Sequence, residues 1–316
     1  MTNNMNILVV GFGNMGCRHT QSILNSNIKA TIWVIEPSDE IFKINSEKIG
    51  AITGQLNRLK QIEELSFSTD FAIVATSAEP RFEVVKKLLN IGIKNLLVEK
   101  VVFQSEPQFD EITRLLEQNG AKAYCNFVNR YFNHYGAIKE NLVPEVPTSM
   151  IVLGGDFGLG CNGLHYVDLF NFITNQESNI VNYNLSENKT PHKRGINFKE
   201  VVGNMSWSNI KGDRLLVSSD IKRGSVVEIV ISNNENLFFV GENTQTLIKM
   251  TLGEDLLFDT ANPLYTSTLT SQIVIDIITG KTLLPTIQET RNCHIQFFGA
   301  INSTLGLAKN ENCPIT

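Results

Sequence analysis

The feature that most constrains the fold is a glycine-rich turn near the start of the sequence, Gly11-Phe-Gly13-Asn-Met-Gly16. An apolar run at residues 7–10 precedes it directly, and a stretch with helical character follows it to about residue 24. A short, continuous apolar run is typical of a strand that is buried on both faces of a sheet. The segment therefore predicts a strand, a tight turn and a helix in immediate succession.

Strands and helices alternate over the first third of the chain. Strands are expected at residues 31–35, 71–76 and 95–98, with a helix that opens at Pro80 and another at about 109–116. Such alternation is typical of a doubly wound parallel sheet with helices on both faces. The sequence thus predicts an N-terminal α/β domain.

The pattern changes after about residue 122. The later strands are longer and two-faced, which favours an antiparallel sheet that is open to solvent on one side. They are expected at 214–220, 225–232 and 236–240, and helices are expected at 165–174, 267–278 and 287–307. We therefore expect an α/β domain at 1–122 and an α+β domain with a large, mostly antiparallel sheet at 123–316.

Composition excludes several classes of protein. The 316 residues contain 27 Lys+Arg and 32 Asp+Glu, a net charge of −5 with no basic block, which argues against nucleic acid as a partner. No apolar run approaches the roughly 18–20 residues that a membrane span needs. Five cysteines without a CxxC pair, and a strand that starts almost at once with no leader before it, predict a cytoplasmic protein.

An acidic residue after the second strand gives the glycine turn a chemical meaning. Glu36 follows Gly11 by 25 positions, close to the roughly 20 that are typical of dinucleotide sites. Gly11 would permit the tight turn, Gly13 the approach of a pyrophosphate, and Gly16 the close packing of helix and strand. Glu36 would accept hydrogen bonds from the adenosine ribose and repel a 2′-phosphate, so NAD is favoured over NADP. The alternative is an ordinary turn without a ligand.

Further segments carry a resemblance to a known family. In chain order they are Gly11-Phe-Gly-Asn-Met-Gly-Cys-Arg-His19, Ala75-Thr76, Val98-Glu99-Lys100, Val128-Asn129-Arg130-Tyr131-Phe132 and Gly163-Leu-His165-Tyr-Val-Asp168-Leu. Together they resemble the glucose-fructose oxidoreductase / inositol dehydrogenase / rhizopine-catabolism (Gfo/Idh/MocA) family, clearly so over residues 6–175. The resemblance implies a Rossmann domain and a substrate domain. It also implies hydride transfer between nicotinamide and a hydroxyl or keto carbon of a sugar, cyclitol or nucleotide-linked sugar.

The resemblance assigns roles to individual residues. Lys100 and His165 take the places of the family's acid/base groups, while Glu99 would orient Lys100 or contact the nicotinamide ribose. The cofactor set is Gly11, Phe12, Gly13, Asn14, Met15, Gly16, Glu36, Thr76, Arg81 and Glu99. The substrate set is Asn129, Arg130, Cys161, Asn162 and Asp168. The competing interpretations are a surface Glu-Lys pair at a strand end and a histidine that belongs to the core.

Three positions depart from the family pattern. Cys161 stands where many members carry an aspartate, Val101 where they carry a proline, and Arg81 where they carry a histidine. A Lys–His pair survives these changes, whereas a Lys–Asp–His triad does not. Two alternatives therefore stay open: an NAD-recycling epimerase or eliminating enzyme, and a dinucleotide-binding sensor or scaffold without turnover.

Other clusters have simpler interpretations. Cys161, His165 and Asp168 share a helical spacing that could hold zinc, but nothing supplies a fourth ligand, and we expect no metal. His192-Lys193-Arg194 with Lys199 is a solvated loop or a site for a substrate phosphate or carboxylate. The exposed sheet face in the second domain predicts a homodimer or homotetramer, with a small carbohydrate-type molecule as the other partner.

Overall fold

The computed structural model describes residues 4–50, 56–190, 195–224, 226–262 and 264–316. The chain divides into two compact units. The first comprises residues 1–103, 107–126 and 264–289, and the second comprises 104–106, 127–263 and 290–316. The main division thus falls after residue 126, and a late segment of the chain returns to the first unit.

The first unit is built on a six-stranded parallel sheet with the order β3-β2-β1-β4-β5-β6. Its strands are β1 (Met5–Val10), β2 (Ala30–Ile35), β3 (Leu56–Leu59), β4 (Phe71–Val74), β5 (Asn95–Val98) and β6 (Lys122–Cys125). Its helices are α1 (Asn14–Leu24), α2 (Asp39–Lys48), α3 (Ala78–Asn90), α4 (Glu106–Asn119) and α7 (Thr266–Thr279). All four residues of β4 are buried, as expected for a strand covered on both faces. The predicted doubly wound parallel sheet is confirmed.

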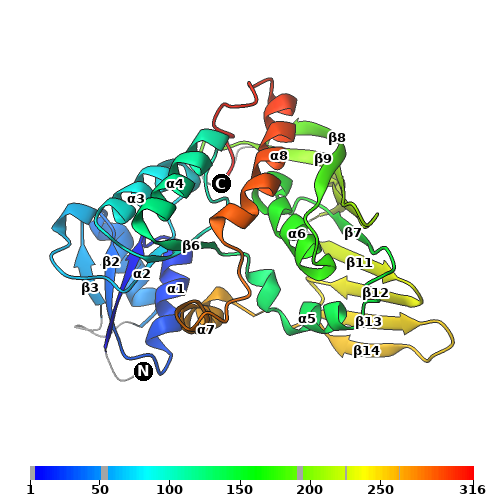
Figure 1. Cartoon of the computed structure of the whole chain (residues 1–316), viewed down its shortest axis with the longest axis horizontal. Coiled ribbons are helices and arrows are strands. Elements are labelled where there is room, and N and C mark those ends of the chain that lie inside the picture. The colour runs from blue at the N-terminus through cyan, green and yellow to red at the C-terminus, as the bar shows by residue number, and fades with distance from the viewer. Residues whose placement is uncertain (1–3, 51–55, 191–194, 225, 263) are drawn as a thin grey trace. The chain divides into compact units, whose positions relative to one another are not determined.

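Helix α7 joins this unit from far along the chain. It lies against α1 (Figure 1), where the Ser271 backbone N–H donates to the Ser22 hydroxyl. The sequence pattern predicts this helix but places it in the second domain, because chain order alone says nothing of a return. The physical reason for the return is the buried polar side of α1, including His19 and Ser22, for which α7 supplies hydrogen-bond partners.

The second unit is built on an eight-stranded sheet with the order β14-β13-β12-β11-β7-β10-β9-β8. Its strands are β7 (Ser149–Gly154), β8 (Asn179–Asn188), β9 (Glu200–Ser208), β10 (Arg214–Ser219), β11 (Val227–Asn233), β12 (Asn236–Gly241), β13 (Thr246–Thr251) and β14 (Leu257–Thr260). Among the described strands of this sheet, only the β7–β10 pair is parallel. The expected large, mostly antiparallel sheet is confirmed.

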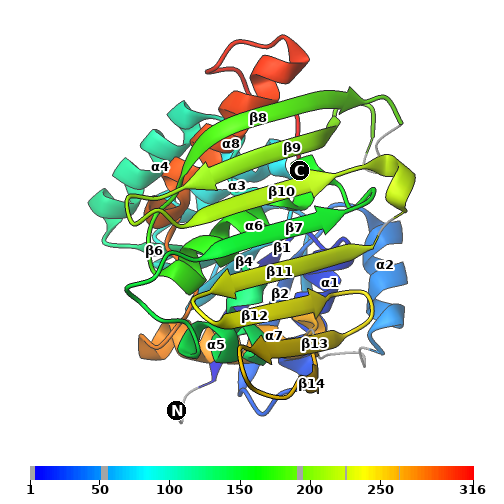
Figure 2. The same cartoon turned by 90° about the vertical axis from the view of Figure 1, so that its right-hand side faces the viewer.

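The two faces of this sheet differ. Helices α5 (Asn133–Glu140), α6 (Leu159–Thr174) and α8 (Ile287–Leu305) lie on one side of it, and Figure 2 looks onto the other side. Burial alternates along the strands accordingly: Met150 and Val152 of β7 are buried, whereas Ile151 between them is exposed. Among the described residues, no helix is both long and apolar enough to cross a membrane.

Candidate functional site

The glycine turn joins β1 to α1 in a conformation that larger side chains would obstruct. Gly11 has φ +87°, and a Cβ there would lie 3.0 Å from the Thr76 backbone nitrogen. A Cβ on Gly16 would collide with the carbonyl oxygen of Gly11. At Gly13, by contrast, no described atom beyond the glycine and its two chain neighbours comes within 4 Å of such a Cβ. The turn is closed on its inner side and open at Gly13, next to the first N–H groups of α1, so it fits a pyrophosphate.

Glu36 is fixed beside this turn. One carboxylate oxygen accepts a hydrogen bond from the Phe12 backbone N–H (3.1 Å), and the other accepts one from Ser38 N–H (3.0 Å). The side chain is buried at the end of β2. A carboxylate has about four acceptor positions, so two remain for ribose hydroxyls. The buried hydroxyl of Thr76, for which the described residues supply no hydrogen-bond partner, is a second polar atom that fits a bound cofactor.

Two other residues support the turn from α2. The Asn45 side chain donates to the Phe12 carbonyl oxygen (2.6 Å), and Lys48 donates to the side chain of Asn14 (3.3 Å). Met15 is half-buried in the first turn of α1. Sequence reasoning missed Asn45, because a polar residue in an amphipathic helix resembles an ordinary surface position.

Glu99 and Lys100 follow β5, and both are buried. Glu99 Oε1 contacts His19 Nε2 at 2.9 Å and accepts a hydrogen bond from Asn126 at 2.6 Å. His19 Nδ1 in turn contacts the Thr270 hydroxyl at 2.8 Å. Burial alone would raise the pKa of Glu99, but His19 and Asn126 lower it to about 2. Near neutral pH, an ionised carboxylate therefore stands next to Lys100.

Arg81 connects two loops of the first unit. Its buried guanidinium donates hydrogen bonds to the backbone oxygens of Thr76, after β4, and Val101, after Lys100. The Lys100–Val101 peptide bond is cis. In this position Arg81 ties the loop that carries Lys100 to the loop that faces Gly11. Its predicted contact with the cofactor stays a prediction.

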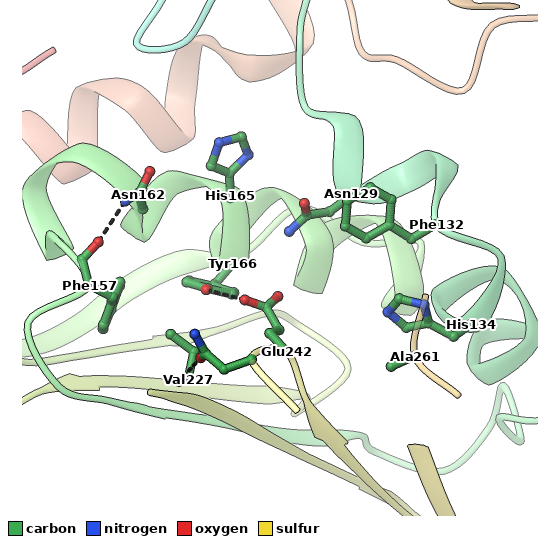
Figure 3. Close-up of a pocket in the computed structure, with 11 residues that line it drawn as sticks. Asn129, Phe132, His134, Phe157, Asn162, His165, Tyr166, Val227, Glu242 and Ala261 are labelled. Atoms are coloured by element: carbon green, nitrogen blue, oxygen red, sulfur yellow. Dashed lines mark hydrogen bonds between the residues drawn. The ribbon is translucent and has the colours of Figure 1, made fainter. Parts of the chain in front are cut away.

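The second unit contains a cavity of about 370 Å³ on the helix side of its sheet. Helix α6 contributes three lining residues and a 3₁₀ turn, η2 (Val128–Tyr131), contributes Asn129. The lining residues are Asn129, Phe132, His134, Phe157, Asn162, His165, Tyr166, Val227, Glu242, Asn243 and Ala261. Figure 3 shows His165 and Asn162 on the same helix as Tyr166 and the Glu242 carboxylate directed toward Tyr166.

The cavity brings together two of the predicted substrate residues, Asn129 and Asn162, and the predicted catalytic residue His165. The Asn162 side chain donates to the Phe157 carbonyl oxygen (2.6 Å). The His165 ring packs edge-on against Phe127, with 5.6 Å between centroids. A titratable imidazole at the wall of a polar cavity is suited to move a proton to or from a bound hydroxyl.

The other predicted substrate residues are not among the described lining residues. Asp168 is buried on α6 and accepts two hydrogen bonds from the Arg130 guanidinium, at 2.7 and 2.9 Å. The Cys161 thiol donates to the Thr316 backbone oxygen (2.7 Å). The Arg130–Asp168 pair therefore holds η2 against α6, which positions Asn129 and His165 on neighbouring walls.

Two clusters from the sequence remain to be placed. Within the described ranges, no three His, Cys, Asp or Glu side chains gather as a metal site would require, Cys161, His165 and Asp168 included. His192, Lys193 and Arg194 lie outside the described residues, and Lys199 forms an exposed ion pair with Glu187 at 2.9 Å.

Glu242 is the residue of this site that sequence reasoning missed. It follows β12 in a Gly-Glu-Asn sequence that is typical of a surface turn, so no local signal marks it. Tyr135 and Tyr166 each donate a phenolic hydrogen bond to one of its oxygens, at 3.0 and 2.9 Å. Only the folded chain brings these three residues together.

Comparison with known proteins shows which family the first part of the chain is similar to. Residues 5–127 match the model of the oxidoreductase family with an NAD-binding Rossmann fold, Gfo/Idh/MocA. No curated protein matches the chain by sequence.

Solved structures share the fold along nearly the whole chain. UDP-N-acetylglucosamine 3-dehydrogenase GnnA from Acidithiobacillus ferrooxidans is 12% identical, with a TM-score of 0.76, over 96% of this chain and 100% of that one. An oxidoreductase from Agrobacterium radiobacter, in complex with NAD+, L-tartaric acid and magnesium, is 12% identical, with a TM-score of 0.74, over 96% and 97%. A super-repressor mutant of Gal80p from Saccharomyces cerevisiae is 14% identical, with a TM-score of 0.74, over 96% and 96%.

The residues that match the family model include the glycine turn, Glu36 and the Glu99-Lys100 pair. These are among the residues on which the sequence resemblance is based. The family match also confirms NAD as the cofactor of the fold, in agreement with the open pyrophosphate position at Gly13. Residues 5–127 therefore match the Gfo/Idh/MocA family of oxidoreductases, whose family model describes an NAD-binding Rossmann fold.

Proposed function

We propose that the protein is an NAD-dependent dehydrogenase or reductase that acts on a hydroxyl or keto carbon of a sugar, cyclitol or nucleotide-linked sugar. The observation that carries this proposal is the polar cavity with His165 in its wall, in a chain whose other unit is an NAD-binding domain. Bound NAD would accept or return the hydride. GnnA, a nucleotide-sugar dehydrogenase by its description, supports the carbohydrate class.

The chain's own residues would handle the proton. His165 would take the hydroxyl proton when a carbonyl forms and give it back in the reverse direction. Lys100, as the second acid/base group, would polarise the reacting oxygen or shuttle its proton. Glu99, kept ionised by His19 and Asn126, would hold the Lys100 ammonium in place. The remaining predicted site residues would bind and orient: Gly11, Phe12, Gly13, Asn14, Met15, Gly16, Glu36, Thr76 and Arg81 the cofactor, and Asn129, Arg130, Cys161, Asn162 and Asp168 the substrate.

A screen of sugars, cyclitols and nucleotide sugars for NADH formation tests the activity. We expect one class to support turnover, and mass spectrometry of co-purified ligand gives an independent route to the same compound. Net conversion of a ring without NADH accumulation would favour the epimerase or eliminating enzyme instead. Ligand binding with no conversion of any kind would favour the sensor.

We also propose that the protein is a homodimer or homotetramer. The strand register aligns apolar residues across the uncovered face of the second unit's sheet. In order they are Leu216, Ile151, Val230, Phe239, Ile248 and Phe258. Leu216 and Ile151 are each 36% exposed and Phe258 is 71% exposed. A continuous apolar row of this kind is typical of a protein–protein interface, and light scattering would measure the assembly.

We also propose that the protein is located in the cytoplasm. The sequence has five cysteines, an odd number, and no CxxC pair, which suits a reducing compartment. Fractionation of cells that express the tagged protein would test it, and recovery outside the cytoplasm would contradict it.

A further inference from the structure

The cavity of the second unit contains a carboxylate whose geometry is fixed by neutral partners. Glu242 projects from the end of β12 into the cavity (Figure 3). Tyr135, on α5, donates to one oxygen and Tyr166, on α6, donates to the other. A carboxylate has about four acceptor positions, so two remain for a ligand. The two phenols thus fix a carboxylate that lines the cavity and leave part of its acceptor capacity unused.

The electrostatic environment of Glu242 is unfavourable for a lone negative charge. Burial raises the pKa of Glu242, and the hydrogen bonds from Tyr166 and Tyr135 oppose this rise. Burial and the nearby carboxylate raise the pKa of both tyrosines well above the usual value, so both remain protonated donors. Their donation favours the ionised carboxylate but supplies no positive charge to balance it.

Apart from His165, to which the proposed function gives a proton-transfer role, the other described lining residues do not supply that charge either. Asn129, Asn162 and Asn243 are neutral amides, and burial lowers the pKa of His134 to about 4, so this imidazole is neutral near pH 7. Neither lysine nor arginine occurs among the described residues that line the cavity. A partly desolvated carboxylate without a counter-charge is costly, and a cation that enters beside it removes that cost.

We propose that the cavity binds a carbohydrate or cyclitol ring that bears an ammonium group, with Glu242 as its partner. The ammonium would donate charge-assisted hydrogen bonds to the two free positions of the carboxylate. A carboxylate or phosphate on the same ring would meet Glu242 with like charge and would be rejected. The inference rests on the proposed function only in taking this cavity as the substrate site.

A second role for Glu242 has to be separated from this one. Its bonds to Tyr135 and Tyr166 also connect α5 and α6 to the sheet, so a substitution could disturb the cavity without any role in charge recognition. A merely structural role would weaken the binding of all ligands alike. A recognition role would change the order in which charged and neutral ligands bind.

Binding to the full-length protein, saturated with NADH, separates these roles. The probes are glucosamine, N-acetylglucosamine, glucose and glucuronate, which share a ring and differ in charge. We expect the wild type to bind glucosamine about tenfold or more tighter than glucose and N-acetylglucosamine, and glucuronate weakest. Glu242→Gln should reduce the preference for glucosamine to about threefold or less, whereas Glu242→Asp, which keeps the charge, should retain it. Glu235→Gln, at an exposed site, is the matched control and should bind as the wild type does.

The other outcomes either overturn this inference or separate it from the proposed function. Glucosamine that binds no tighter than glucose, or not at all, contradicts it directly. An equal loss for all four probes in Glu242→Gln assigns Glu242 a structural role only. If glucosamine is preferred but no sugar is ever converted, the oxidoreductase proposal fails and the charge preference stands. If turnover is found but only with neutral or acidic rings, this inference fails alone.

Discussion

Glu36 is the residue on which the choice of cofactor depends. Its carboxylate is held at the end of β2 by the backbone N–H groups of Phe12 and Ser38, so it cannot move aside without losing both bonds. We predict that Glu36→Ala lowers the affinity for NAD by about tenfold, as for the loss of a charge-assisted hydrogen bond, and removes the preference over NADP. Fluorescence titration with both cofactors measures this. Wild-type protein that binds NADP more tightly would contradict the role of Glu36.

The Glu99–His19 pair gives the first unit a predictable pH dependence. The pKa of Glu99 falls from 4.5 to about 2 on folding, so its ionised form contributes stability above the unfolded-state value. That contribution is lost as the pH falls through the interval between the two values. We predict that Glu99→Gln lowers the free energy of unfolding by about 3 kcal/mol near pH 7 and by only about 1 kcal/mol near pH 3.

Chemical denaturation at a series of pH values measures this difference. Glu63→Gln is a matched control, since Glu63 pairs with Lys87 at the surface, where both side chains are more than half exposed. The control should change stability little at any pH. A Glu99→Gln effect that stays constant with pH would show that the pair does not act through charge.

At the scale of elements, substitutions in the turn between β1 and α1 should distinguish an effect on folding from an effect on cofactor binding. Gly13→Ala adds a methyl group where the described chain leaves space, so the free energy of unfolding should change by about 1 kcal/mol or less. The affinity for NAD should fall tenfold or more, because the methyl group obstructs the pyrophosphate. Gly16→Ala adds the same group against the Gly11 carbonyl and should lower stability and affinity together. Thermal unfolding and NAD titration of both variants test this. Equal effects at the two positions would contradict it.

The sequence predicted most elements of this fold because their signals are local. Apolar runs gave β1, β4 and β5, and alternating patterns gave β10 to β12 to within a few residues. Helix α6 begins at Leu159, six residues before the expected start, because Gly160 and Gly163 are typical of a loop. In the structure these glycines are buried in the helix, where a Cβ on Gly163 would press on Phe297. Their small size reflects close packing rather than a turn.

Site residues were predicted from the sequence only where a motif or a typical spacing marks them. The glycine turn, Lys100 and His165 lie in runs of consecutive motif residues, and Glu36 is marked by its distance of 25 positions from Gly11. Glu242 and its partners Tyr135 and Tyr166 are separated by up to 107 positions, and their meaning arises from the sheet register and helix packing. The order of residues in the sequence does not show that these three side chains meet. It also does not show that α7 belongs to the first unit, because both results depend on contacts between distant segments.

At the scale of the whole molecule, the exposed row on the second unit's sheet should control assembly. Ile151→Lys places a charge within this row, between Leu216 and Val230, and should shift the protein toward the monomer by destabilising the interface. Ile44→Lys, at an exposed apolar position on α2 of the first unit, is the matched control. Light scattering across a range of protein concentrations measures the mass of the assembly for the wild type and both variants. A wild-type monomer, or an Ile151→Lys protein that assembles unchanged, would contradict the proposed interface.

The central claim is that Lys100 and His165 perform proton transfer for an NAD-dependent reaction. Its most direct test compares the turnover of Lys100→Ala and His165→Ala with that of the wild type, on the substrate that the screen returns, with NAD affinity measured in parallel. If Lys100 and His165 transfer protons, the kcat of each variant should be about 100-fold or more below that of the wild type. Both should still bind NAD, and Lys122→Ala, an exposed lysine at the start of β6, should retain full activity. Turnover that survives the loss of His165 would contradict the account.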